Sequence, residues 1–155
     1  MSTDPLRERV MEQYRRPVSV ETYNAVRELW KAHSMAEDAR DLDGLIATLT
    51  PDCVYEFVPG GPRWEGHSGA RRFYTEFLGA FPDVHFDLQN IVIGPQGVFQ
   101  HARATGTWKG PWCGRAPTSA GRRMERTVLI FFPYDAERRL FTGEIVYGSA
   151  FDGIE

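Results

Sequence analysis

The chain has 155 residues, of which 42% are hydrophobic and 13% aromatic, so it can form one stable domain but has no room for a second. Its 18 basic and 21 acidic residues give a formal net charge of −3, which argues against a nucleic-acid surface as the main function. The first 16 residues are charged throughout and no later segment approaches the length of a membrane span, so we expect a cytoplasmic protein with no nucleic-acid or membrane partner.

A short helix is predicted first, within an N-terminal helical extension that we assign to residues 1–18. Asp4 can cap this helix, and Pro5 fits its first turn because proline lacks the N–H that a first turn leaves unused. Pro17 would end it. Residues 19–155 then form the main domain.

A second, longer helix is predicted to begin at Ser19, which can cap it. Its apolar residues recur at steps of three and four and therefore share one face; they are Tyr23, Val26, Trp30, His33 and Ala36. His33 should point inward, either as a core histidine with one partner or as part of a pocket.

A third short helix is predicted over residues 42–49, followed by a strand that starts at Cys53 and ends at the Pro59 turn. On this strand Tyr55 and Phe57 lie opposite Glu56. The sequence does not decide which of the two faces is buried. The other cysteine, Cys113, lies far away along the chain and no C-x-x-C occurs, so we expect reduced thiols and no metal site.

A middle helix is predicted over residues 69–81, capped by Ser68, and the periodicity then changes to that of strands. Four strands are predicted, over residues 85–94, 97–108, 122–135 and 138–148. Helices come first and a meander of strands follows, so the fold class is α+β.

The strand near residue 130 is apolar on both faces. Val128 and Ile130 lie on one side, and Leu129 and Phe131 lie on the other. A single layer of helices would leave one of these faces exposed, so we predict a homodimer through the outer face of the sheet. The alternative is a monomer in which a long loop covers that face.

His101 and Arg103 share one face of the strand over residues 97–108. Charged groups rarely occupy a half-buried face without a partner, a ligand or water. Imidazole titrates near neutrality and guanidinium can hold an enolate or carboxylate oxygen, so this pair is a candidate for catalysis.

Several motifs carry a resemblance to a known family. They are TLTPDCVYEF, the G-x-x-G-A-R-R-F-Y opening of the middle helix, the AFPD that closes it, and ATGTWKG followed by GRAPTSAGR. Their order and spacing resemble the SnoaL-like polyketide cyclases and the related ester cyclases of the nuclear transport factor 2-like superfamily. The resemblance covers roughly residues 20–152.

The resemblance implies a cone-shaped fold, in which a curved antiparallel sheet packs against three to four helices and encloses a deep apolar pocket. In the cyclases this pocket holds an aromatic polyketide ester, an aspartate on the last strand acts as the acid–base group, and no metal or organic cofactor is needed. Ser149 stands at the position of that aspartate here, and Trp108 stands where a histidine is common. In related epoxide hydrolases a tyrosine and an asparagine take part, at positions that correspond to Tyr55 and Phe57.

These considerations predict an enzyme that uses no cofactor and acts on a small hydrophobic carbonyl or polyketide-like compound, with His101 and Arg103 as its catalytic pair. The expected substrate-binding residues are Trp30, His33, Tyr55, Phe57, Tyr147 and Ser149. Glu144 is expected on the face opposite Tyr147, paired with an arginine such as Arg126. Asp152 could serve only if the chain turned back. The alternatives are a non-catalytic homodimer that binds small molecules and an enzyme of the epoxide hydrolase or isomerase type.

Overall fold

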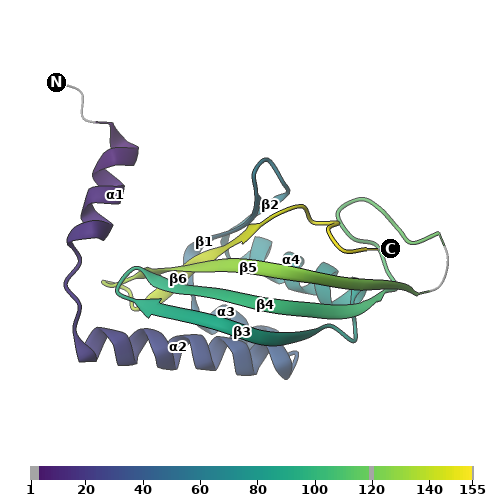
Figure 1. Ribbon diagram of the computed structural model, residues 1–155, viewed down its shortest axis with the longest axis horizontal. Helices are drawn as coiled ribbons and strands as arrows, with labels where there is room; N and C mark the ends of the chain where they lie inside the picture. The colour runs from purple at the N-terminus through teal and green to yellow at the C-terminus, as the bar shows by residue number, and fades with distance from the viewer. Residues whose placement is uncertain (1–3, 119–120, 155) are drawn as a thin grey trace.

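A computed structural model describes residues 4–118 and 121–154 and confirms the α+β class (Figure 1). The helices are α1 (Pro5–Arg15), α2 (Val20–Asp38), α3 (Leu42–Ala47) and α4 (Gly66–Ala80). The strands are β1 (Leu49–Val58), β2 (Arg63–Glu65), β3 (His85–Gly94), β4 (Gly97–Trp108), β5 (Arg122–Asp135) and β6 (Leu140–Tyr147). Within these residues, no helix has the length and apolar character needed to cross a membrane.

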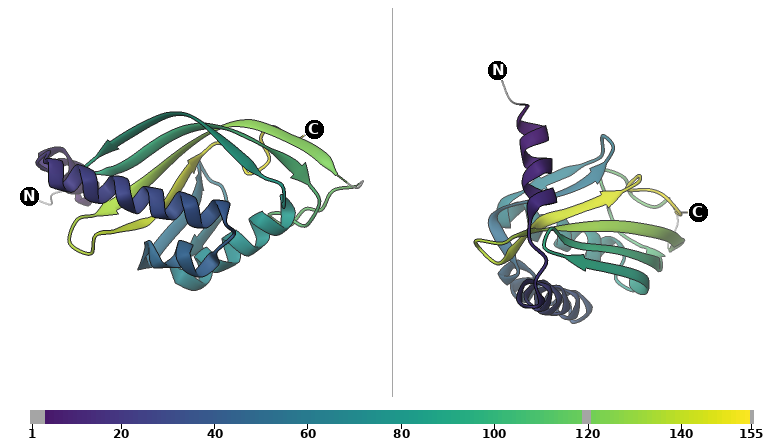
Figure 2. Two further views of the ribbon diagram at one scale, coloured as in Figure 1. Left: turned by 90° about the horizontal axis from the view of Figure 1, so that it is seen from below. Right: turned by 60° about the vertical axis from the view of Figure 1, so that its left-hand side comes forward.

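The strands form one curved sheet in the order β2-β1-β6-β5-β4-β3, which arches over α2, α3 and α4 (Figure 2). Neighbouring strands are antiparallel except β1 and β6, which run parallel. The resemblance implied a curved antiparallel sheet, and the parallel β1–β6 pair departs from this description. Strands joined by a short turn must run antiparallel, but β1 and β6 are separated by α4 and four strands, so no local turn determines their relative direction.

The sheet has an inner face, toward the helices, and an outer face. On β4 the buried residues Val98, Gln100, Ala102 and Ala104 take the inner face, while Phe99 on the outer face is 37% exposed. The inner face of β5 carries Met124, Val128, Ile130 and Phe132. This alternation follows from the two-residue period of a strand.

The helices begin close to their predicted starts. The Ser19 hydroxyl accepts a hydrogen bond from the Thr22 N–H at 3.1 Å and caps α2, whose buried residues include His33. Helix α4 starts at Gly66, before the predicted cap Ser68, and no side chain caps it. The chain passes directly from β2 into this helix, so the capping residue expected from sequence lies inside its first turn.

Aromatic rings fill the interior where the resemblance implied a deep hollow. Trp112, in the connection between β4 and β5, is only 1% exposed. Its ring stacks on Trp64, with centroids 5.9 Å apart and an interplanar angle of 16°, and it lies 5.5 Å from Phe77 and 6.1 Å from Phe57. The middle of the interior is therefore occupied by an indole of the chain itself.

Helix α1 projects from the rest of the molecule and has no buried residue (Figures 1 and 2). Its start agrees with the prediction, since the Asp4 carboxylate accepts a hydrogen bond from the Leu6 N–H at 3.0 Å. Arg16, just after the helix, donates to the carbonyl oxygens of Pro95 at 3.1 Å and Tyr134 at 2.9 Å. These bonds attach the base of the helix to the sheet and leave its length exposed.

Candidate functional site

His101 and Arg103 lie on the outer face of β4 and not in the interior where the sequence placed them. Ala102 between them is fully buried on the inner face. His101 Nδ1 is 3.0 Å from Asn90 Nδ2, and Arg103 Nε donates to Glu125 Oε1 at 2.9 Å. The inner positions of this strand hold mostly small apolar side chains beneath the arch, so the imidazole and the guanidinium lie on the outer side, toward water and a carboxylate.

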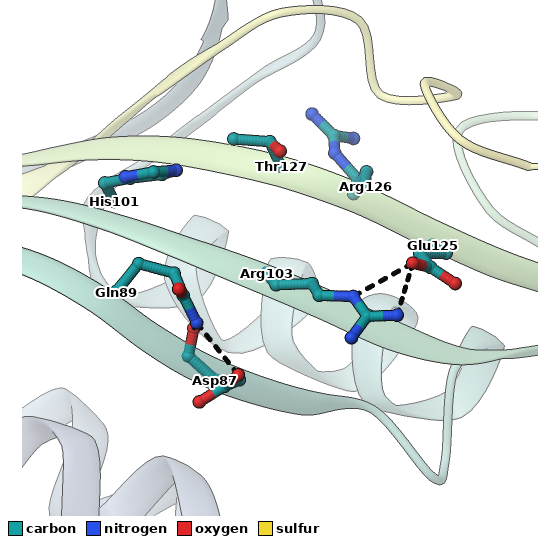
Figure 3. A pocket seen from close by; sticks show the side chains of 7 residues that line it. All are labelled: Asp87, Gln89, His101, Arg103, Glu125, Arg126 and Thr127. Carbon is teal, nitrogen blue, oxygen red and sulfur yellow. Dashed lines mark hydrogen bonds and ion pairs between the residues drawn. The ribbon is translucent and has the colours of Figure 1, made fainter.

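His101 and Arg103 border an open depression of about 520 Å³ on the outer face (Figure 3). The other residues that line it are Asp87, Gln89, Glu125, Arg126 and Thr127. Charged and polar groups dominate this surface, unlike the apolar pocket that was expected. The Arg126 side chain points away from Arg103 and Glu125 in Figure 3.

A buried hydrogen-bond network on the inner side joins side chains from four elements. They are His33 of α2, Tyr55 of β1, Tyr74 of α4 and Glu144 of β6, each at most 5% exposed. Tyr74 donates its hydroxyl hydrogen to Glu144 Oε1 at 2.7 Å, and the same oxygen is 3.0 Å from His33 Nε2. The hydroxyl oxygens of Tyr55 and Tyr74 are 2.8 Å apart. We call these four residues the His33–Glu144 network.

Thr48 determines which nitrogen of His33 carries a hydrogen. The Thr48 hydroxyl donates to the Leu45 carbonyl oxygen at 2.6 Å, so it accepts a hydrogen bond from His33 Nδ1 at 2.7 Å. Nε2 then faces Glu144, and a proton on either group is within reach of the other. The imidazole and the carboxylate can therefore share one exchangeable proton in a buried site.

Burial changes the acid–base behaviour of the groups around this proton. Burial, and next the charge of Glu144, raises the pKa of Tyr55 and of Tyr74 well above the usual range, so both phenols stay protonated as donors. Burial also raises the pKa of Glu37, one helical turn after His33, to about 8, with Glu144 as the second cause. Glu37 can therefore hold a proton at neutral pH.

Four of the expected substrate-binding residues, with His33 among them, lie on β1 and on α2. Tyr55 and Phe57 are buried on the inner face of β1, which decides an orientation that the sequence left open. Trp30 is half-buried, and its Nε1–H donates to Gln100 Oε1 at 3.3 Å. Trp30, Tyr55 and Phe57 thus lie on the inner side of the sheet together with His33.

The two expected residues from the last strand lie elsewhere. Tyr147 is 43% exposed on the outer face, and Ser149 is exposed beyond the end of β6. The prediction that Glu144 lies opposite Tyr147 is confirmed, but Glu144 takes the inner face and pairs with His33 rather than with Arg126. A buried imidazole across the interior offers this carboxylate a partner that strand alternation alone does not reveal.

The chain does turn back after β6. Asp152 accepts a hydrogen bond from the Ser149 N–H at 2.8 Å and lies 4.0 Å from Arg126 Nη2. Its side chain is 55% exposed, and it is not part of the His33–Glu144 network. Asp152 thus returns to the end of the sheet without entering the interior cluster.

Tyr74 and Glu37 were missed from sequence, although a signal existed for each. Glu37 follows His33 by four residues on a helix, a spacing that places both on one side. Tyr74 lies four residues after the buried Ala70 in the middle helix. In both cases a helical period leads from a known inward residue to the missed one.

The described part of the chain, residues 4–118 and 121–154, contains no group of three His, Cys, Asp or Glu side chains placed to hold a metal ion. Cys53 is buried and Cys113 half-buried, and neither forms a disulfide. Burial raises the pKa of each thiol to about 11, so neither is an ionised nucleophile at neutral pH.

Residues 26–137 match the family model of the SnoaL-like domain. This match covers most of the chain, including the greater part of α2, all of α3 and α4, and the first five strands. No curated protein sequence matches the chain.

Solved structures share the fold at low sequence identity. A proposed SnoaL-like polyketide cyclase from Jannaschia sp. CCS1 has a TM-score of 0.65 at 22% identity, covering 85% of this chain and 88% of that one. A proposed polyketide cyclase from Xanthomonas campestris has a TM-score of 0.64 at 19% identity, covering 82% and 92%. A protein with a ketosteroid isomerase-like fold from Catenulispora acidiphila, bound to trimethylamine, has a TM-score of 0.63 at 17% identity, covering 81% and 88%. These likenesses show the fold.

Proposed function

Because this chain belongs to the SnoaL-like domain family, we propose that it is an acid–base enzyme acting on a small hydrophobic carbonyl or polyketide-like compound. The proton-transfer group is the His33–Glu144 pair, and the reaction uses no cofactor. One observation supports this above all: a carboxylate, an imidazole and two phenols meet on the inner face of the sheet, inside an otherwise aromatic interior.

The chemistry of the network suits removal of a proton from carbon next to a carbonyl group. Glu144 takes the proton, His33 stabilises the carboxylate or accepts the proton in turn, and the electron pair moves to the carbonyl oxygen to form an enolate. Tyr55 remains protonated and can turn its hydroxyl hydrogen from Tyr74 to that oxygen, while Tyr74 keeps donating to Glu144. Substrate enters only when the ring of Trp112 leaves the middle of the interior.

An exchange reaction tests this proposal. In D₂O, the protein should accelerate exchange of the α-hydrogens of 2-tetralone, an aromatic ketone, as followed by proton NMR. Glu144→Gln should slow the accelerated exchange by about 100-fold or more, because the base is lost while the shape is kept. Glu56→Gln is the matched control, since Glu56 lies on the other face of β1 and pairs with Arg63. Equal rates for Glu144→Gln and wild type would refute the role of Glu144.

A non-catalytic binding protein is the second candidate function. It is favoured by the packed interior and by Ser149, which stands exposed where the resemblance places the catalytic aspartate. In that case aromatic ketones would raise the melting temperature of the protein without any acceleration of exchange. Measuring both the α-hydrogen exchange and the melting temperature on one sample therefore separates an enzyme from a binding protein.

We also propose a cytoplasmic location, which agrees with two cysteines that remain thiols and with the lack of a membrane-spanning helix in the described residues.

A further inference from the structure

Arg126 is a buried cation at one end of the interior. It lies on the inner face of β5, and its side chain is 9% exposed. Its guanidinium carbon is 6.0 Å from the centre of the Phe57 ring. Arginine keeps its charge in proteins, and burial of a cation is costly without partners for its N–H groups.

One edge of this guanidinium has a hydrogen-bond partner. The other edge, formed by Nε and Nη2, has none among residues 4–118 and 121–154, and we call it the open edge. Nη1 donates to the Ser149 carbonyl oxygen at 2.8 Å. Nε and Nη2 are buried, and neither has a hydrogen-bond partner among residues 4–118 and 121–154. Asp152 does not fill this gap, because its nearest oxygen is 4.0 Å from Nη2 and already accepts a hydrogen bond from the Ser149 N–H.

The open edge has the geometry of a carboxylate receptor. The N–H groups of Nε and Nη2 point in parallel from the same side of the planar guanidinium, the arrangement that binds both oxygens of a carboxylate. Burial lowers the pKa of Arg126, whereas the charge of Asp152 raises it. An anion bound at the open edge would offset the cost of burying the cation.

The surroundings of Arg126 specify what such an anion would be attached to. The Trp112 indole fills the adjacent aromatic space, stacked on Trp64. Its Nε1–H donates to the Ala150 carbonyl oxygen at 2.8 Å, one residue beyond the carbonyl that Arg126 contacts. The indole and the guanidinium therefore meet the same short turn after β6. Both also neighbour the Phe57 ring, whose centre is 6.0 Å from the guanidinium carbon and 6.1 Å from the centre of the indole.

We propose that the interior binds an aromatic carboxylic acid, whose ring takes the place of the Trp112 indole and whose carboxylate pairs with Nε and Nη2 of Arg126. This inference deepens the proposed function by naming a charged group of its ligand. It rests on the proposed function only in that both place the ligand in the same interior.

The test uses the variant Trp112→Leu, which opens the aromatic space, and two probes of nearly equal shape: 1-naphthoate and the neutral 1-naphthamide. Isothermal titration calorimetry at neutral pH should show naphthoate binding about 10- to 100-fold more tightly than the amide, as expected for a charge-assisted bidentate contact. Adding Arg126→Met should remove this preference. Adding Arg123→Gln should leave it intact, because Arg123 lies on the same strand but is 65% exposed and pairs with Glu125.

Each contrary result would overturn the inference. Equal affinity for the two probes, a preference that survives Arg126→Met, or no binding of either probe to Trp112→Leu would each do so.

Failure of the proposed function gives a different pattern. Trp112→Leu with Glu144→Gln should still prefer naphthoate, since Glu144 takes no part in holding the anion. Loss of exchange of 2-tetralone with this preference retained would reject catalysis alone. Loss of the preference with exchange retained would reject the anion site alone.

Discussion

Among single residues, the buried polar ones of the His33–Glu144 network matter most for stability and for the proposed chemistry. Each would be costly in an aromatic interior without partners, and the structure provides them: His33 has Thr48 and Glu144, and Tyr74 has Glu144 and Tyr55. Such a satisfied network can hold a proton close to where an apolar substrate would lie. Because these residues act through their charges and protons, their effect on stability is measured by varying the pH.

Glu37 should make the protein less stable as pH rises. Its pKa is about 8 in the folded state and 4.5 in a model peptide, so between these values the folded state keeps a proton that the unfolded state loses. The stabilising effect is complete below pH 4.5 and is lost as pH rises through 8. The slope of this contribution is at most about 1.4 kcal/mol per pH unit. Urea unfolding from pH 5 to 8 measures it.

Glu37→Gln should lack this slope, whereas Glu28→Gln should keep it, because Glu28 is exposed on the same helix with 57% of its side chain accessible. The difference between variant and wild type isolates Glu37 from the acidic groups that titrate at lower pH. Parallel stability curves for wild type and Glu37→Gln would contradict the assignment.

Among the elements, the contact between β1 and β6 is the one that local sequence does not explain. The parallel pairing is irregular between Leu49 and Val54 on β1. Gly143 of β6 lies at this irregularity with a φ of +123°, and a Cβ atom there would be 1.8 Å from the Val54 carbonyl oxygen. Only glycine allows the two strands to approach in this way, and the contact holds Glu144 in its inward position.

Gly143→Ala should therefore lower the free energy of unfolding by about 2 kcal/mol or more, from backbone strain and the clash together. For a chain of this length that corresponds to a fall in melting temperature of roughly 4–8 °C. Gly79→Ala in α4 is the matched control, since nothing lies within 4 Å of its added carbon and a helical alanine is favoured. Thermal unfolding followed by circular dichroism compares the two, and an equal effect of both would contradict this account.

The outer face of the sheet is the feature that concerns the whole molecule. Exposed apolar residues gather there, with Val92 at 67%, Phe99 at 37%, Leu129 at 36% and Tyr147 at 43%. The Phe99 ring lies 5.9 Å from that of Tyr147. This patch adjoins the depression that His101 borders, because His101 of β4 lies opposite Leu129 of β5. The homodimer predicted from sequence would cover these apolar side chains, which is the reason we retain it as a prediction.

Phe99→Glu should convert the expected dimer to a monomer, because a carboxylate would be buried against apolar partners. Sedimentation velocity measures the change. Met35→Glu is the control, an equally large change at an exposed residue of α2, outside the patch. If the wild-type protein sediments as a monomer at micromolar concentration, this interface does not form.

The sequence alone determined the family, the α+β class and the existence of nearly every helix and long strand, since caps and apolar periods are local signals. It also placed His33 inward, because a 3.6-residue period carries that residue to the same side as Val26 and Ala36. Which face of β4 and β6 is the inner one was decided only by tertiary structure. Both faces carry apolar residues, so alternation shows that Glu144 and Tyr147 differ but cannot show which of them the helices cover.

Strand alternation does not show which face is covered, and for this reason the sequence assigned His101 and Arg103 to the interior and did not assign Glu144 to it. The partners that make a buried charge tolerable come from elsewhere in the chain: Glu144 meets His33 across 111 positions of sequence. Packing of the helices against the sheet brings these groups together, and only after that packing do a carboxylate and an imidazole become a buried pair.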